Sequence, residues 1–143
     1  MLLIRIVAVW LLLIGAEVVH GVARAILLVP RVGDLRARQI GVFSGSALIL
    51  AIASLAAPWL RARTAPAQML AGSVWLVLTL WFEIAFGRLV VKASWERIGS
   101  DYNLARGGLL PLGLAVLTLA PWIGARLARG TPKDVETRLP ADL

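Results

Sequence analysis

Apolar residues gather in four long runs that hold few polar positions, and short polar segments separate these runs. A helix needs roughly 20 residues to cross a hydrocarbon core of about 30 Å. The runs reach this length and predict spans over about residues 6–29, 40–60, 69–91 and 109–127. Because the apolar residues are continuous and do not alternate with polar ones, an outer-membrane barrel is excluded. We therefore predict an all-α integral membrane protein with four transmembrane helices.

The segments outside the spans are polar or aromatic. We predict turns over residues 30–39 and 61–68, a longer connection over residues 92–108, and a polar, flexible tail over residues 131–143. Aromatic residues at span ends suit the interfacial belt of a membrane protein. These residues are Trp59, Trp95, Tyr102 and Trp122.

The first span has a second interpretation, as a cleaved signal peptide. Its apolar stretch is too long for that role, and Glu17, His20 and Arg24 lie inside it. We therefore treat it as a permanent span, which puts both termini on the same side of the membrane. Basic residues are almost balanced between the two sides, and an Ala-Arg pair after each Pro-Trp favours cytoplasmic termini. The Arg-rich composition suggests a bacterial source, so we expect the bacterial cytoplasmic (inner) membrane.

The two halves of the chain resemble each other. Residues 57–63 (APWLRAR) parallel residues 120–126 (APWIGAR), and both copies carry the rare Pro-Trp pair. We therefore predict two tandem two-helix hairpins, over residues 1–66 and 67–130. Since each hairpin crosses the membrane twice, both copies enter it in the same direction, as a parallel repeat about an axis along the membrane normal.

Composition narrows the possible chemistry. Apolar residues make up 59% of the chain, which exceeds the roughly 45–50% of an ordinary soluble domain. The absence of Cys excludes disulfides, thiolate metal sites and cysteine nucleophiles, and a single His excludes a multi-histidine metal site within one chain. The net charge of +7 comes mostly from basic residues at span ends, so we do not expect a nucleic-acid partner.

Ionisable residues lie inside the predicted spans. Glu17 is near the middle of the first span, and Glu83 lies about one turn past the middle of the third. A charge at the bilayer centre costs at least about 2.5–3.5 kcal/mol, so both carboxylates must face the bundle interior, water or a partner. Helical spacing places His20 and Arg24 on the same face as Glu17.

Two hypotheses explain these charges. In the functional one, a polar pocket forms an ion or ligand pathway, and basic turns at its rim attract an anion or a lipid headgroup. The pathway candidates are Glu17, His20, Arg24, Glu83 and Arg88, and the rim candidates are Arg31, Arg97 and Asp101. In the structural one, Glu17 pairs with Arg24 or Arg88 and Glu83 pairs with another Arg, and these pairs only set helix register.

Other kinds of site have weaker support. Glu17, His20 and Glu83 have ligand types that suit zinc or iron, but a single imidazole does not predict a metal site. The serines, Ser44 among them, have no credible His–Asp partnership, so we predict no catalytic residue. The sequence indicates no particular cofactor.

Three functions remain open from the sequence. The first is a small transport or permeation protein, oligomeric in the bilayer, that moves a small ion or anionic solute past intramembrane carboxylates. The second is an accessory or assembly subunit of a larger membrane complex. The third is an intramembrane enzyme acting on a lipid or quinone, for which His20 beside Glu17 is the only support.

Overall fold

The computed structural model describes residues 1–130, and all the regular structure in that range is helical. Four helices are long and apolar enough to cross a membrane: α1 (Leu2–Leu27), α3 (Asp34–Leu60), α4 (Ala65–Leu89) and α6 (Leu110–Arg129). The short elements are α2 (Val29–Val32), α5 (Trp95–Tyr102) and the 3₁₀ turn η1 (Leu104–Arg106). The prediction of an all-helical chain with four helices that are long and apolar enough to span a membrane is confirmed for these residues. The predicted tail, residues 131–143, lies outside the described residues.

Two boundaries differ from the prediction, and both involve polar segments. Helix α3 begins at Asp34, whereas the apolar run begins only at Ile40. An ion pair between Arg38 and Asp34, four residues apart, lies along this polar first turn. The connection after α4 contains α5, and its start is capped because the Ser94 hydroxyl accepts a hydrogen bond from the backbone N–H of Arg97 (3.1 Å).

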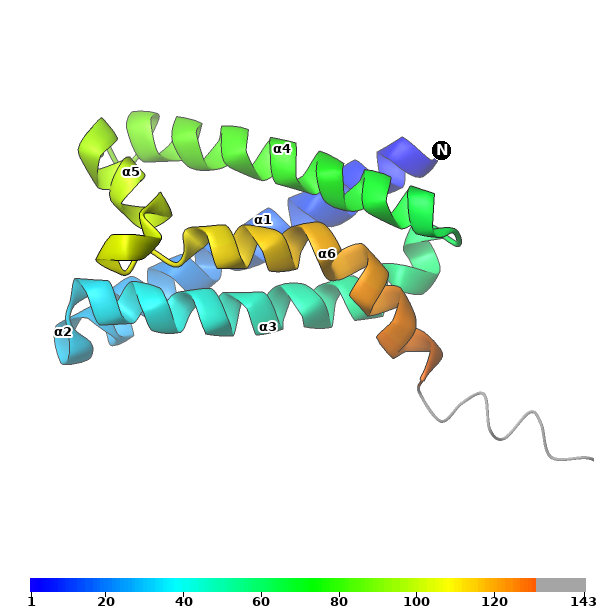
Figure 1. Cartoon of the computed structure of the whole chain (residues 1–143), viewed down its shortest axis with the longest axis horizontal. Coiled ribbons are helices and arrows are strands. Elements are labelled where there is room, and N and C mark those ends of the chain that lie inside the picture. The colour runs from blue at the N-terminus through cyan, green and yellow to red at the C-terminus, as the bar shows by residue number, and fades with distance from the viewer. Residues whose placement is uncertain (131–143) are drawn as a thin grey trace, which may run out of the picture.

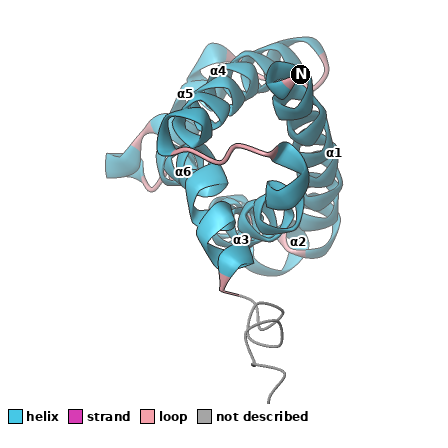
Figure 2. Cartoon of the chain, turned by 90° about the vertical axis from the view of Figure 1, so that its right-hand side faces the viewer, coloured by secondary structure: helices cyan, strands magenta, loops and turns pink. Residues whose placement is uncertain are grey.

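The four long helices form a bundle around a common interior (Figures 1 and 2). Helix α1 packs against α3 and α4, and α6 also packs against α3 and α4. Going round the bundle, the order is therefore α1, α3, α6, α4 (Figure 2). The chain runs one way through α1 and α4 and the other way through α3 and α6 (Figure 1).

Two glycines allow α6 to approach its neighbours closely. A Cβ atom built on Gly72 of α4 would lie 1.8 Å from the carbonyl oxygen of Thr118. A Cβ atom on Gly124 of α6 would lie 2.8 Å from the carbonyl carbon of Ala53 in α3. Lipid supplies no hydrophobic driving force between helices, so such close backbone contacts are a principal source of their association.

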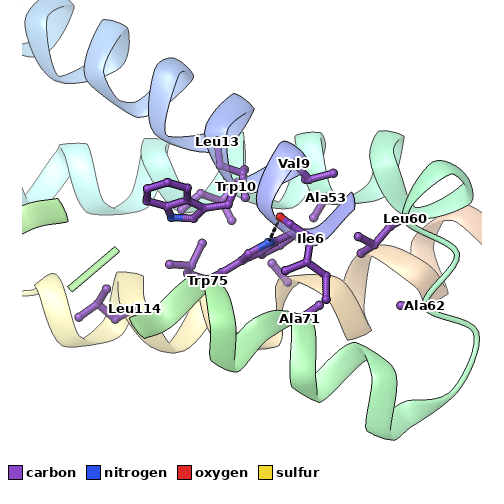
Figure 3. Packing of buried hydrophobic residues seen from close by; sticks show 13 residues of the cluster. Ile6, Val9, Trp10, Leu13, Ala53, Leu60, Ala62, Ala71, Trp75 and Leu114 are labelled. Atoms are coloured by element: carbon purple, nitrogen blue, oxygen red, sulfur yellow. Dashed lines mark hydrogen bonds between the residues drawn. The ribbon is translucent and has the colours of Figure 1, made fainter. Parts of the chain in front are cut away.

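Two tryptophans connect α1 to α4 in the buried core (Figure 3). The indole N–H of Trp75 donates a hydrogen bond to the carbonyl oxygen of Ile6 (2.9 Å). The indole N–H of Trp10 donates one to the hydroxyl of Thr79 (3.0 Å). Both indoles are buried, and Leu13 packs beside them. Because both bonded pairs are 69 residues apart, α1 and α4 run parallel and in register at this level.

Further along, α1 diverges from α4 and lies against α3. Its Arg24 side chain lies close to Gly41 of α3, and its Glu17 carboxylate lies close to Gly45. Figure 1 shows α1 crossing the bundle obliquely, from the start of α4 toward the start of α3. This divergence leaves space in the bundle beyond the tryptophan contacts.

The close approach at Gly72 generates a first prediction. Gly72→Ala places a methyl group against the Thr118 carbonyl, and overpacking of this kind costs about 1–3 kcal/mol of folding free energy. We expect a clearly lower midpoint of thermal unfolding in detergent. Size-exclusion chromatography of samples heated to increasing temperatures measures this midpoint.

Gly15→Ala is the matched control for this change. No atom outside the helix lies within 4 Å of the Cβ position at Gly15, so the better helix propensity of Ala should leave the midpoint unchanged or raise it. Equal midpoints for both variants would contradict the described α4–α6 contact.

Candidate functional site

A cavity of about 590 Å³ occupies the space that α1 leaves as it diverges. We call this space, bordered by all four long helices and the α5–α6 connection, the central cavity. Leu13, Thr79 and Leu117 border it toward the tryptophan core, while Gln39 and Gly107 border the end that faces α5. Its volume falls within the range of about 300–1,000 Å³ that is typical of small-molecule sites.

The central cavity brings together part of the predicted site. Five of the candidates line it: Glu17, His20, Arg24, Glu83 and Asp101. The other three do not border it: Arg31, Arg88 and Arg97. Residues from α1, α4 and α5 therefore meet around one space, and the arginines predicted to form a basic rim do not border it.

Glu17, His20 and Ser44 form a hydrogen-bonded chain between α1 and α3. The Ser44 hydroxyl donates to the carbonyl oxygen of Ile40 (3.0 Å), so its oxygen is free to accept from Nε2 of His20 (2.8 Å). Nδ1 of His20 then faces Oε2 of Glu17 at 3.4 Å. The second carboxylate oxygen of Glu17 is buried and has no hydrogen-bond partner among the described residues.

The contacts among these three side chains correct the sequence-based statement that no serine has a histidine–acid partnership. Ser44, His20 and Glu17 do contact one another in that order. The partnership was missed because Ser44 lies 24 residues from His20 on another helix. Acyl transfer also needs donors for a developing oxyanion, but α3 is continuous around Ser44 and its backbone N–H groups are used within the helix. The backbone of α3 therefore offers no free N–H donor beside Ser44.

Arg24 of α1 and Glu83 of α4 border the central cavity without a direct partner among the described residues. Neither side chain makes a hydrogen bond or ion pair within the described residues, although each lies within electrostatic reach of the other. The structural hypothesis expected Glu17 to pair with Arg24 or Arg88 and Glu83 to pair with an arginine. No such pair occurs in residues 1–130, where Glu17 instead pairs with His20.

Four charged residues at the end of the cavity form a closed ring of ion pairs, which we call the ion-pair ring. Arg38 bonds to Asp34 (3.2 Å) and to Asp101. Arg97 bonds to the same two acids, at 3.1 and 3.4 Å. Each acid thus touches both arginines, and the ring joins the start of α3 to α5. Its four charges cancel.

The pathway candidate Arg88 and the rim candidate Arg31 bind other groups of the protein. Arg88 donates a hydrogen bond to the carbonyl oxygen of Ala93 (2.7 Å), and its guanidinium lies 4.8 Å from the ring centre of Trp95. Arg31 of α2 donates to the carbonyl oxygen of Leu27 at the end of α1. These arginines bind backbone or aromatic groups, so they do not form a basic entrance to the cavity.

Sequence reasoning missed several residues of the site. Arg38 and Gln39 border the cavity, and Gln39 donates a hydrogen bond to the Gly107 carbonyl (3.1 Å). Phe82 and Phe86 stack at 5.3 Å and line it beside Glu83. One signal was present in the sequence. In Asp34-x-x-x-Arg38 the acid comes first, and in Arg97-x-x-x-Asp101 the base comes first. When two such helices lie side by side, each acid can face a base on the other helix.

Tyr102 lies outside the membrane spans, at the end of α5. Its hydroxyl is buried and has no hydrogen-bond partner within the described part of the chain. Burial raises the pKa of Tyr102 above its ordinary value of 10.0, and the negative charges of Glu83 and Asp101 raise this pKa further. The phenol therefore reports the charge on Glu83.

No group of three His, Asp or Glu side chains in residues 1–130 is arranged to hold a metal ion. No protein family, curated protein or solved structure matches this chain.

The single tyrosine of the chain gives a direct test of this geometry. Glu83→Gln removes a negative charge near Tyr102, so the pKa of the phenol should fall toward its ordinary value. Near-ultraviolet absorbance of the phenolate, followed as detergent-solubilised protein is titrated with base, measures this pKa. Because the folded state favours the neutral phenol, its stability should also decrease as pH rises above the unfolded pKa.

Glu96→Gln is the control for this titration. Glu96 is exposed on α5 and does not border the central cavity, so its removal should leave the phenol titration as in the unmodified protein. If Glu83→Gln also leaves it unchanged, the described placement of Glu83 near Tyr102 is wrong.

Proposed function

We propose that the protein is a small proton-coupled carrier that holds a small ion or solute in the central cavity. The observation that supports this proposal most strongly is the Glu17–His20 contact, which lies at membrane depth and borders the cavity. Intramembrane ionisable residues that face a cavity are typical of proton relays and substrate pathways. The chemistry of the lining indicates which species could be carried.

The Glu17–His20 pair is suited to hold one exchangeable proton. With Nε2 of His20 bonded to Ser44, one proton between Nδ1 and the Glu17 carboxylate makes the pair neutral overall. Loss of that proton leaves one negative charge facing the cavity. The charged groups facing the pair are Arg24 on α1, Glu83 on α4, and Arg38 and Asp101 of the ion-pair ring.

The shape of the central cavity also suits a carrier. One end reaches the polar segments around α5, while the other ends at the buried tryptophan core. A solute can thus enter from one side without a continuous pore through the bundle. A carrier needs such one-sided access to couple proton and solute movement.

The expected partners are the lipid bilayer and further copies of this chain or the subunits of a membrane complex. A shallow apolar groove on the outer side of α1 supports this part of the proposal. Gly15, Ala16 and Val19 border it together with Leu48 of α3. Small residues let a neighbouring helix approach closely, so this groove suits helix packing between subunits. The same groove would serve an accessory subunit of a larger complex.

We further infer a duplicated hairpin as the origin of the fold. Both second helices carry a proline near their carboxyl ends, Pro58 in α3 and Pro121 in α6. The helices that would be equivalent run in the same direction and lie side by side, α1 with α4 and α3 with α6. This arrangement supports two tandem copies. A two-fold axis through the centre of the bundle would place equivalent helices opposite each other, whereas here they are neighbours.

We propose a bacterial inner membrane location with the amino-terminal end of α1 and the carboxyl end of α6 on the cytoplasmic side. Both ends lie at the same end of the bundle (Figure 1). The central cavity would then open toward the periplasm. A carboxyl-terminal fusion to an enzyme that is active only in the cytoplasm should be active, and a periplasmic reporter at that position should be inactive. The reverse pattern would overturn the orientation.

Transport itself is tested in proteoliposomes that contain a trapped pH-sensitive dye. Gradients of chloride, acetate, potassium and tetraethylammonium are imposed in turn, and the dye reports coupled proton movement. We expect at least one gradient to drive proton flux, and Glu17→Gln to reduce this flux to that of protein-free liposomes because the exchangeable proton is lost.

Glu96→Gln, on the exposed face of α5, should retain the flux of the unmodified protein. Size-exclusion profiles of all variants show whether each remains folded. Folded Glu17→Gln protein with unchanged flux would falsify the proposed role of the pair.

A further inference from the structure

Once the ion-pair ring is set aside, the net charge of the groups that line the central cavity depends on one proton. Arg38 and Asp101 belong to that ring, whose charges cancel. The remaining lining groups are two carboxylates, Glu17 and Glu83, against one arginine, Arg24, and one histidine. When the Glu17–His20 pair holds its proton, these groups balance. When it does not, the cavity carries one excess negative charge.

Three of the arginines near the mouth of the cavity already have partners. Arg97 and Arg38 are each bonded to two acids, and Arg88 lies against Trp95. The basic rim predicted from the sequence is therefore neutralised or directed elsewhere. Arg24 is the one cavity-lining arginine in residues 1–130 without an acid at contact distance, and Glu83 and Glu17 offset it.

The walls of the cavity are mainly apolar and partly aromatic. Phe82 and Phe86 stack against each other and border the cavity on either side of Glu83 in the sequence. Trp10 meets Phe82 edge to face, with ring centres 6.4 Å apart. Aromatic faces attract organic cations, particularly where water is excluded. A strongly hydrated ion would lose part of its water shell against such walls, and no group of three His, Asp or Glu side chains in residues 1–130 is placed to hold a metal ion in its stead.

We propose that the central cavity binds a lipophilic organic monocation, with its charge beside Glu83 and its apolar groups against Phe82 and Phe86, in exchange for one proton of the Glu17–His20 pair. This inference rests on the proposed carrier function and names its substrate class. The exchange conserves charge: one monocation enters the cavity and one proton leaves to solvent. No electrons are transferred, and the only covalent bond that changes is the bond to the proton.

Two probes of the same shape and opposite charge test the sign of the substrate. Tetraphenylphosphonium is a lipophilic monocation, and tetraphenylborate is its anionic counterpart. Binding of each to the full-length protein in neutral detergent is measured by equilibrium dialysis against protein-free micelles. We expect saturable binding of the cation alone. In weakly buffered solution, cation binding should acidify the medium, and its affinity should rise with pH.

Variants separate this proposal from general hydrophobic binding. Glu83→Gln removes the partner charge and should weaken cation binding about tenfold or more. Arg24→Gln removes the opposing positive charge, so it should strengthen cation binding. Glu17→Gln should abolish proton release on binding. Glu96→Gln, outside the cavity, should bind the cation as the unmodified protein does.

The outcomes distinguish this inference from the carrier function. If tetraphenylborate binds preferentially while chloride or acetate gradients still drive proton flux, the protein is a carrier and the cation assignment is overturned. If the cation binds with the same affinity in all four variants, its binding does not involve the cavity charges and the inference fails. If there is neither saturable binding nor coupled flux, the carrier function fails with it.

Discussion

Two indole N–H groups connect the first and third membrane spans, and the rest of the bundle depends on them. In hydrocarbon a buried donor has no water to bond, so Trp10 and Trp75 must each find an acceptor in the protein. They find one on each other's helix, at Thr79 and Ile6. These bonds bring α1 and α4 together at one end of the bundle only. The remainder of α1 packs against α3, and the central cavity is the result.

The charged residues around the cavity fall into two groups, those paired with one another and those without a direct partner. At the outer end of the cavity, Asp34, Arg38, Arg97 and Asp101 neutralise one another in a closed ring that joins α3 to α5. Inside, Glu17 shares a contact with His20, while Arg24 and Glu83 face open space. Near the membrane interface the free energy of desolvating charged groups is small, so ion pairs can stabilise the structure there. The unpaired groups deeper in the bundle cost more, which is why we associate them with function.

The sequence predicts features that depend on one segment and not those that depend on packing between segments. The four spans follow from apolar length alone, and helical spacing places His20 on the face of Glu17. Ser44 could not be assigned to His20, because nothing in α1 specifies which face of α3 it meets. The pairing of Asp34 with Arg97, 63 residues apart, likewise depends on where α5 lies. Helix α5 itself was missed because a short, polar helix has no apolar run.

The two tryptophan bonds also restrict how α1 can move. Ile6 and Trp10 lie one turn apart on the same face of α1, and their partners lie one turn apart on α4. Rotating α1 about its axis or sliding it along α4 would break both bonds together. The pair therefore holds α1 against α4 in one rotation and one axial position. Glu17 lies seven residues beyond Trp10, on the same face of this continuous helix, so two bonds at one end of the bundle also set the direction in which that carboxylate faces.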